Sequence, residues 1–252
     1  MAPPLAGSLA PCGPVVDAPA AGWALEALQE PATANGWSAV LEAAWPSLAP
    51  VFAASPYLSG LARRSPDRLR RILEEPPESR LDELLAEARA AGSDPESGGV
   101  RLRRAKGDLH LLTALADLGG VWDLGEATGA LTRFADAAVD AALRIAVAEA
   151  QARGRLSHIL PAEAGPLPGL FVIAMGKHGA FELNYSSDID ISIFYEPEAL
   201  PVADGVEPQS FAVQLTQRLA QLLQERTAEG YVFRVDLRLR PDPAATGRAS
   251  GS

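Results

Sequence analysis

Three aspartates in the last third of the chain are spaced so that neighbouring strands can bring their carboxylates together. Asp188 and Asp190 stand at alternate positions where an apolar, β-branched run begins, and that run ends near Tyr195. Because side chains alternate between the faces of a strand, we expect both carboxylates on one face, roughly 6–7 Å apart. Asp236 lies in a second alternating segment, residues 231–240, which we expect beside the first. Carboxylates gathered on one face are unfavourable unless a cation lies between them.

The chemistry of such a trio follows from the ions that it would bind. Hard carboxylate oxygens suit Mg²⁺ or Mn²⁺. A carboxylate set on neighbouring strands is also what a two-metal site for phosphoryl or nucleotidyl transfer requires. We therefore predict that Asp188, Asp190 and Asp236 are both the metal ligands and the catalytic residues. Three exposed strand carboxylates without a metal are the alternative interpretation.

Residues next to this trio are candidates for binding a nucleotide or its phosphates. Gly176 follows an apolar run at residues 170–175, and glycine lets turn N–H groups approach a phosphate. A glycine that only ends a strand is the alternative. Lys177 in the same turn and Ser187 before the first aspartate are further candidates, each weighed against an ordinary solvated side chain.

Two arginines complete the candidate set for phosphate binding. Arg238 and Arg240 share the expected face of Asp236, and guanidinium groups clamp phosphates through paired hydrogen bonds. Ion pairs between these arginines and the carboxylates are the alternative.

The two motifs together resemble a known family. Residues 175–190 read MGKHGAFELNYSSDID, and residues 234–241 read RVDLRLRP. This combination is similar to the bifunctional glutamine synthetase adenylyltransferase/adenylyl-removing enzymes of the nucleotidyltransferase superfamily, which carry two such domains in one long chain. The ELNYSSDID wording resembles the N-terminal, adenylyl-removing copy, whereas the adenylylating copy typically has Gly at the position of Asn184. The family commonly has Leu where His178 stands, so we assign His178 no role.

The resemblance implies an activity and its partners. Inorganic phosphate would attack an adenylyl-tyrosine of glutamine synthetase, with Mg²⁺ or Mn²⁺ as cofactor, and ADP would leave. A nitrogen-signalling regulatory protein would be a partner of the full-length enzyme, and ATP or ADP its nucleotide. Three alternatives stay open: adenylylation of glutamine synthetase from ATP, another nucleotidyltransferase acting on a small molecule or RNA, and a docking fragment without catalysis.

Composition limits the kinds of partner and the cellular compartment that we expect for this protein. The formal net charge of −10 over 252 residues argues against a nonspecific nucleic-acid binder. Cys12 is the one cysteine, so no disulfide can form within the chain, as suits a reducing cytosol. The sequence contains no run of 18 apolar residues and no secretion signal at its start. We therefore expect a cytoplasmic protein that binds neither membranes nor nucleic acid.

The order of elements predicts an α+β fold, in which a largely helical region packs on a small mixed-sheet nucleotidyltransferase core. Because the family's chains are several times longer, we interpret this chain as a fragment that stops just past the third carboxylate. The expected parts are a disordered leader (1–21), a helical region (22–160), a truncated core (161–241) and a flexible tail (242–252).

Local patterns predict the helices and where they begin and end. The first two helices are expected at residues 23–29 and 37–44, with Pro46 and Pro50 stopping the second. Ser65 and Ser210 are expected to cap later helices. Longer helices are expected at residues 100–118 and 124–153, from apolar residues at helical spacing. The helix expected at residues 100–118 carries a basic stretch, which we interpret as a solvated face: Arg101, Arg103, Arg104 and Lys106.

Overall fold

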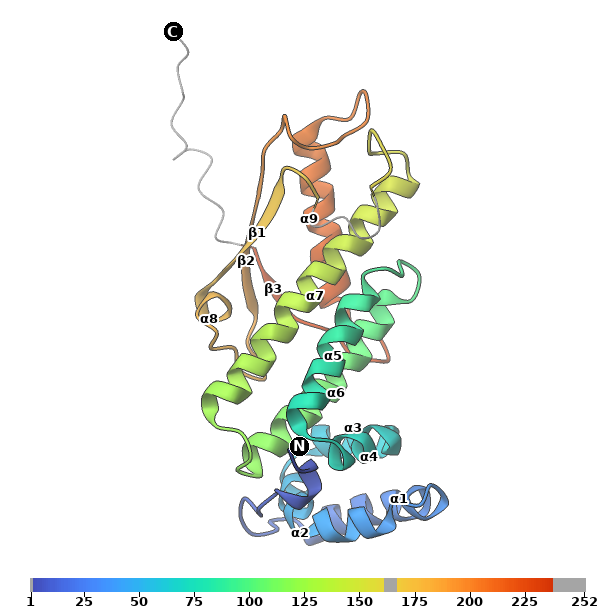
Figure 1. Ribbon diagram of the computed structural model, residues 1–252, viewed down its shortest axis with the longest axis vertical. Helices are drawn as coiled ribbons and strands as arrows, with labels where there is room; N and C mark the ends of the chain where they lie inside the picture. The colour runs from blue at the N-terminus through green and yellow to red at the C-terminus, as the bar shows by residue number, and fades with distance from the viewer. Residues whose placement is uncertain (1, 161–166, 238–252) are drawn as a thin grey trace.

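The computed structural model describes residues 2–160 and 167–237. Helices occupy most of these residues, and the strands among them form one small mixed sheet (Figure 1). The α+β class expected from the sequence is therefore confirmed. The helices are η1 (Leu5–Gly7), α1 (Ala18–Ala34), α2 (Ser38–Ala54), α3 (Pro56–Arg64), α4 (Pro66–Glu74), α5 (Pro77–Ala91), α6 (Gly98–Leu118), α7 (Leu124–Ala152), α8 (Gly176–Gly179) and α9 (Pro208–Gln224). The strands are β1 (Leu170–Met175), β2 (Ile189–Tyr195) and β3 (Val235–Asp236).

Helix α2 continues through the two prolines that were expected to end it. Pro46 and Pro50 both lie inside the helix, although each removes a backbone hydrogen bond at a cost of about 3 kcal/mol. The buried stripe of α2 continues past them through Leu48 and Phe52. Burying each of these side chains contributes about 1.5–3 kcal/mol, so packing offsets the loss.

Part of the segment expected to be a disordered leader is ordered. Leu5 is completely buried, and its N–H donates to the carbonyl of Glu75 at 3.0 Å. The N–H of Ala10 donates to the carbonyl of Gly119 at 2.9 Å, and α1 already begins at Ala18. Contacts to residues distant in sequence therefore hold this Pro- and Ala-rich stretch, while the expected flexible tail at 242–252 lies outside the described residues.

An ion cluster joins α4, α5 and α6. Asp108 of α6 accepts hydrogen bonds from Arg68 of α4 and, at 3.2 Å, from Arg80 of α5. The Arg80 side chain is 1% exposed and that of Asp108 is 8% exposed. Arg80 also donates to Glu83 at 2.7 Å. Since a buried charge is costly without partners, this cluster fixes how the three helices meet.

Helix α7 connects the helical region with the sheet (Figure 1). Its 29 residues span about 44 Å, and it packs against α5, α6 and α9. Asp123 and Glu126 form a capping box at its N-terminus, which satisfies two backbone N–H groups. The apolar stripe expected on α7 is buried, and α9 also buries an apolar stripe.

The expected serine caps are absent. Ser65 precedes α4 but its side chain makes no cap hydrogen bond. Glu207, rather than Ser210, caps α9 by accepting from the N–H groups of Gln209 and Ser210. Ser55 caps α3 by accepting from the N–H of Leu58.

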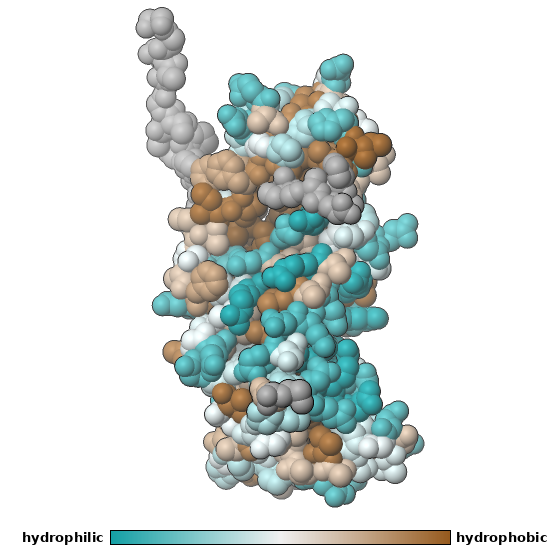
Figure 2. Space-filling view, in the orientation of Figure 1, coloured by the Kyte–Doolittle hydropathy of each residue, from teal (hydrophilic) through white to brown (hydrophobic). Residues whose placement is uncertain are grey.

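The sheet has the order β1-β2-β3, with β1 antiparallel and β3 parallel to β2. Ile189 and Ile191 of β2 are buried. Along β1, Phe171, Ile173 and Met175 are 52%, 42% and 40% exposed, so one face of this strand is open. Apolar surface is visible where β1 and β2 lie (Figure 2). Among the described residues no helix has the length and hydropathy needed to cross a membrane.

The third strand begins later than the sequence predicts. The alternation over residues 231–240 fails at its start, because Val232 and Phe233 are both buried. Their N–H groups both donate to the carbonyl of Leu223 near the end of α9, at 2.9 Å. Because these N–H groups bond to α9 and not to β2, β3 begins only at Val235 among the described residues.

Candidate functional site

The strand register brings two of the three aspartates together. Asp190 and Asp236 are direct partners in the parallel ladder between β2 and β3. Partners on adjacent strands lie about 5 Å apart and point their side chains to the same face. Both residues are half-buried. The sequence prediction that Asp236 lies beside Asp190, on a common face, is therefore confirmed by the backbone.

Gly176 makes room for one of these carboxylates. It directly follows β1, and its φ of +54° is one that L-residues with a side chain rarely adopt. A Cβ at this position would lie 2.5 Å from Oδ2 of Asp190. The sequence pointed to Gly176 as a place where a phosphate approaches, and the structure adds that its missing side chain accommodates Asp190.

Asp188 is turned toward an arginine that the sequence analysis did not select. Arg234 forms an ion pair with Asp188 through Nε and donates to the carbonyl of Ser186 at 2.7 Å through Nη2. The hydrogen bond and charge of Asp188 raise the pKa of Arg234. Within residues 2–160 and 167–237, no three His, Cys, Asp or Glu side chains are arranged to hold a metal ion. The strand register thus places two of the expected ligands side by side, while the side chain of the third is held on Arg234.

The other selected residues have separate positions. Ser187 closes the turn before β2, because its hydroxyl donates to Oδ1 of Asn184 at 3.0 Å and accepts from the Asn184 N–H at 3.1 Å. Lys177 is exposed on α8. Arg238 and Arg240 lie outside the described residues.

His178 has a structural contact although no role was assigned to it. Its ring is 2% exposed, and Nε2 lies 2.8 Å from Oδ1 of Asp136 on α7. This contact fastens the turn that carries Gly176 to the long helix. The sequence alone gave little indication of this contact, since Asp136 is 42 residues away from His178.

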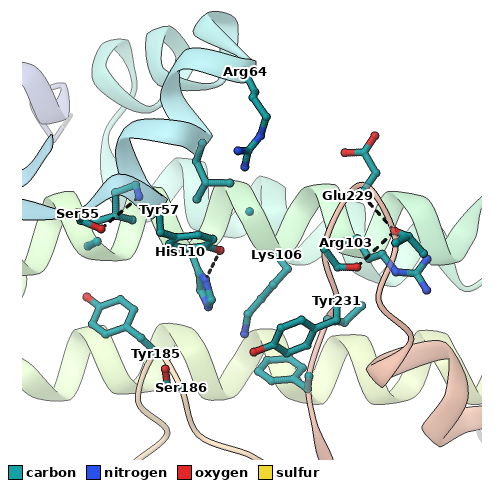
Figure 3. Close-up of a pocket in the computed structure, with 18 of the residues that line it drawn as sticks. Ser55, Tyr57, Arg64, Arg103, Lys106, His110, Tyr185, Ser186, Glu229 and Tyr231 are labelled. Carbon is teal, nitrogen blue, oxygen red and sulfur yellow. Dashed lines mark hydrogen bonds between the residues drawn. The ribbon is translucent and has the colours of Figure 1, made fainter. Parts of the chain in front are cut away.

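A cavity of about 750 Å³ opens beside the turn before β2 (Figure 3). Residues of α3 and α6, Tyr185 to Ser187, and the segment 227–233 line it. Lys106 of α6 points into this cavity, although its side chain was expected on a solvated face (Figure 3). Lys106 and Arg103 are both 5% exposed, whereas Arg101 and Arg104 are exposed. The sequence did contain a sign of this burial, because position 106 lies on the same helical stripe as Leu102 and Leu109.

Burial sets the protonation of the groups around this cavity. It lowers the pKa of the Lys106 amine well below its usual range. Burial, and then the nearby charge of Lys106, lowers the pKa of His110. Burial raises the pKa of Tyr57 and, together with Asp117, that of Tyr185. An added charge close to these buried groups would therefore interact with them strongly.

Comparison with known proteins places the chain in a family. Residues 45–250 match the family described as Glutamate-ammonia ligase adenylyltransferase. The chain is 60% identical over 244 residues to the bifunctional glutamine synthetase adenylyltransferase/adenylyl-removing enzyme of Caulobacter vibrioides, covering 96% of this chain and 24% of that protein. It is 49% identical over 217 residues to the protein of that name from Bradyrhizobium sp. (84% and 21%), and 46% identical over 233 residues to one from Rhodopseudomonas palustris (90% and 23%).

The chain thus spans about a quarter of the length of these curated relatives. The match of the family pattern covers most of the chain and includes both motifs that carry the aspartates. The chain belongs to the glutamate-ammonia ligase adenylyltransferase family.

Proposed function

We propose that this chain carries a metal-dependent nucleotidyl-transfer site that removes AMP from an adenylyl-tyrosine of glutamine synthetase, with inorganic phosphate as acceptor and ADP as product. The observation that carries the proposal is the parallel register of Asp190 and Asp236, with Gly176 leaving space beside Asp190. Adjacent carboxylates on one strand face supply the oxygen ligands that Mg²⁺ and Mn²⁺ prefer. The names of the relatives support glutamine synthetase as the substrate.

The residues present fit a divalent cation on one condition. Asp190 and Asp236 lie side by side, and Asp188 joins them only if it leaves Arg234. The two side chains of that ion pair are 47% and 45% exposed, and an ion pair exposed to solvent contributes little to stability. Exchange of the Asp188 carboxylate from Arg234 to a cation is therefore inexpensive. A bound metal would neutralise charge that develops on the phosphate of the transferred adenylyl group.

Arg234 then has a second part in the proposed site. Once Asp188 turns away, the guanidinium of Arg234 is still held by the carbonyl of Ser186 and by Tyr231, whose OH lies 3.4 Å from Nη1. A guanidinium in this position can donate two parallel hydrogen bonds to the oxygens of a phosphate. We propose that Arg234 passes from Asp188 to a substrate phosphate, the role that the sequence analysis gave to Arg238 and Arg240.

The direction of transfer rests on the motif. The carboxylates serve equally for AMP removal by phosphate and for AMP addition from ATP, and the ELNYSSDID wording at residues 182–190 favours removal. In the whole protein, a nitrogen-signalling regulatory protein would control the balance between the two directions. The cytoplasm is the location that this substrate implies.

The test uses adenylylated glutamine synthetase that carries radiolabelled AMP. We expect the chain to release labelled ADP only when Mg²⁺ or Mn²⁺ and phosphate are both present. Asp190→Asn should abolish release, and Asp204→Asn, which removes an exposed loop carboxylate, should leave it unchanged. Turnover retained in the double variant Asp188→Asn with Asp190→Asn would refute the metal assignment. Incorporation of AMP from ATP without any ADP release would overturn the proposed direction.

A further inference from the structure

The cavity beside α6 is a built pocket with features that the proposed reaction does not use. It lies between the helical region, the turn before β2 and the segment before β3 (Figure 3). Its volume of about 750 Å³ falls in the range of sites for small organic ligands, roughly 300–1,000 Å³. The described ion pairs include none for Arg64, whose guanidinium points toward the cavity in Figure 3.

Lys106 is a buried basic side chain that has no acidic partner among the residues that the structure describes. The described contacts of its amine are with aromatic rings: Nζ lies 3.3 Å from the centre of the Phe233 ring and 5.8 Å from that of Phe134. By contrast, Arg103 and Arg104 of the same helix pair with Glu225 and Glu229, respectively. Because a buried charge is stable only with a counter-charge, Lys106 leaves a place for an anionic group from outside the chain.

Aromatic residues form the wall next to this amine. The rings of Tyr57 and Tyr185 each meet the His110 ring edge to face, at centroid distances of 5.8 Å and 6.2 Å. The Tyr57 hydroxyl and Nδ1 of His110 share a hydrogen bond of 2.8 Å. Nε2 of His110 is buried and has no hydrogen-bond partner among the described residues. Within the described part of the chain, the pocket therefore combines a basic side chain without an acidic partner, a ring nitrogen without a hydrogen bond and aromatic surfaces for a planar group.

We propose that this cavity binds an organic anion that carries an aromatic ring, of the size of a nucleoside monophosphate. The anionic group lies against Lys106, with Arg64 adding positive charge at the rim, and the ring packs among the tyrosines. Both features are needed, because the cation alone would suit any small anion and the rings alone would suit a neutral aromatic molecule.

The site is connected to the carboxylate edge through a short series of contacts. Tyr231 lines the cavity, and its hydroxyl lies 3.4 Å from Nη1 of Arg234, which in turn holds Asp188. A ligand that moves Tyr231 thus acts on the residue that restrains Asp188. Binding itself does not depend on catalysis, so it can be tested without the proposed reaction.

The experiment is isothermal titration of the 252-residue chain in EDTA, which removes any metal from the carboxylate edge. The probes are AMP, inorganic phosphate and adenosine. We expect AMP to bind saturably, and phosphate and adenosine each to bind about tenfold more weakly or worse, because stacking and charge contribute separately. Phosphate binding as tightly as AMP would overturn the ring component, and adenosine doing so would overturn the anion component.

Two variants and a control locate the binding. Lys106→Met keeps the length of the side chain without its charge and should weaken AMP binding by about tenfold to a hundredfold. Tyr231→Leu removes a ring from the wall and should weaken AMP binding more than phosphate binding. Arg133→Met removes an exposed cation of α7 outside the cavity and should change nothing. AMP binding that survives Lys106→Met, or that is absent from the folded native chain, would overturn the proposal.

Discussion

Gly176→Ala is the substitution that tests the packing of the carboxylate edge most closely. Placing a side chain at a φ of +54° costs about 1–2 kcal/mol. Alanine also lowers the conformational entropy of the unfolded chain, which offsets about 0.4–1 kcal/mol of this cost. The new Cβ would also lie 2.5 Å from Oδ2 of Asp190, and moving that carboxylate off its rotamer costs about 0.5–1.5 kcal/mol.

The matched control is Gly154→Ala. Gly154 has a φ of +68° and nothing within 4 Å of the position where a Cβ would stand, so it carries the backbone cost alone. We therefore expect Gly176→Ala to lower the free energy of unfolding by about 2 kcal/mol and Gly154→Ala by about 1 kcal/mol. Urea unfolding of both variants measures this difference.

Activity gives a second and larger readout. A shift of the Asp190 carboxylate by about 1 Å should slow ADP release from adenylylated glutamine synthetase about 100-fold, while Gly154→Ala should keep the native rate. The reasoning is refuted if the two variants lose equal stability and Gly176→Ala retains full activity, because the carboxylate would then have moved aside at no cost.

Three further predictions follow from buried charges and a helix cap. Burial lowers the pKa of Lys106 in the folded chain, so at a pH just below the ordinary lysine pKa of about 10.4 the unfolded chain holds more protons than the folded chain. Lys106→Met should therefore raise the free energy of unfolding, and this increase should shrink as the pH rises toward that value. Urea unfolding at several pH values measures the increase, and an increase that stays constant would contradict the prediction. Asp108→Ala removes the α6 carboxylate that pairs with the buried Arg80 and should cost about 3–5 kcal/mol. Asp140→Ala, at the partly exposed pair with Arg144 on α7, should cost less than about 1 kcal/mol. Equal losses in chemical unfolding would argue against the ion cluster as a fixed joint. Asp123→Ala removes the capping box of α7 and should cost about 1 kcal/mol, seen as a drop of about 2–4 °C in Tm, and an unchanged Tm would exclude the cap as a stabilising element.

The sequence predicted the part of the site that depends on local periodicity. Alternation along β2 placed Ile189 and Ile191 inward, which fixed the face of Asp190. The same argument placed Asp236 on that face, and the parallel register agrees. A one-residue slip would reverse every side chain of a strand, so this part of the geometry is strongly specified by pattern alone.

The remaining features depend on contacts between distant residues. Arg234 and Asp188 are 46 positions apart, and alternation does not say which cation a carboxylate faces. Lys106 is buried beside the rings of Phe233 and Phe134, while its charge alone suggested solvent. Pro50 stays within α2 because tertiary burial outweighs its local preference.

Binding of Mn²⁺ to the chain, followed by electron paramagnetic resonance, tests the carboxylate edge most directly. We predict saturable binding that Asp190→Asn and Asp236→Asn each weaken by about tenfold or more, that Mg²⁺ competes away, and that Asp204→Asn leaves unchanged. Mn²⁺ binding that is indifferent to both substitutions would contradict the placement of the metal between β2 and β3.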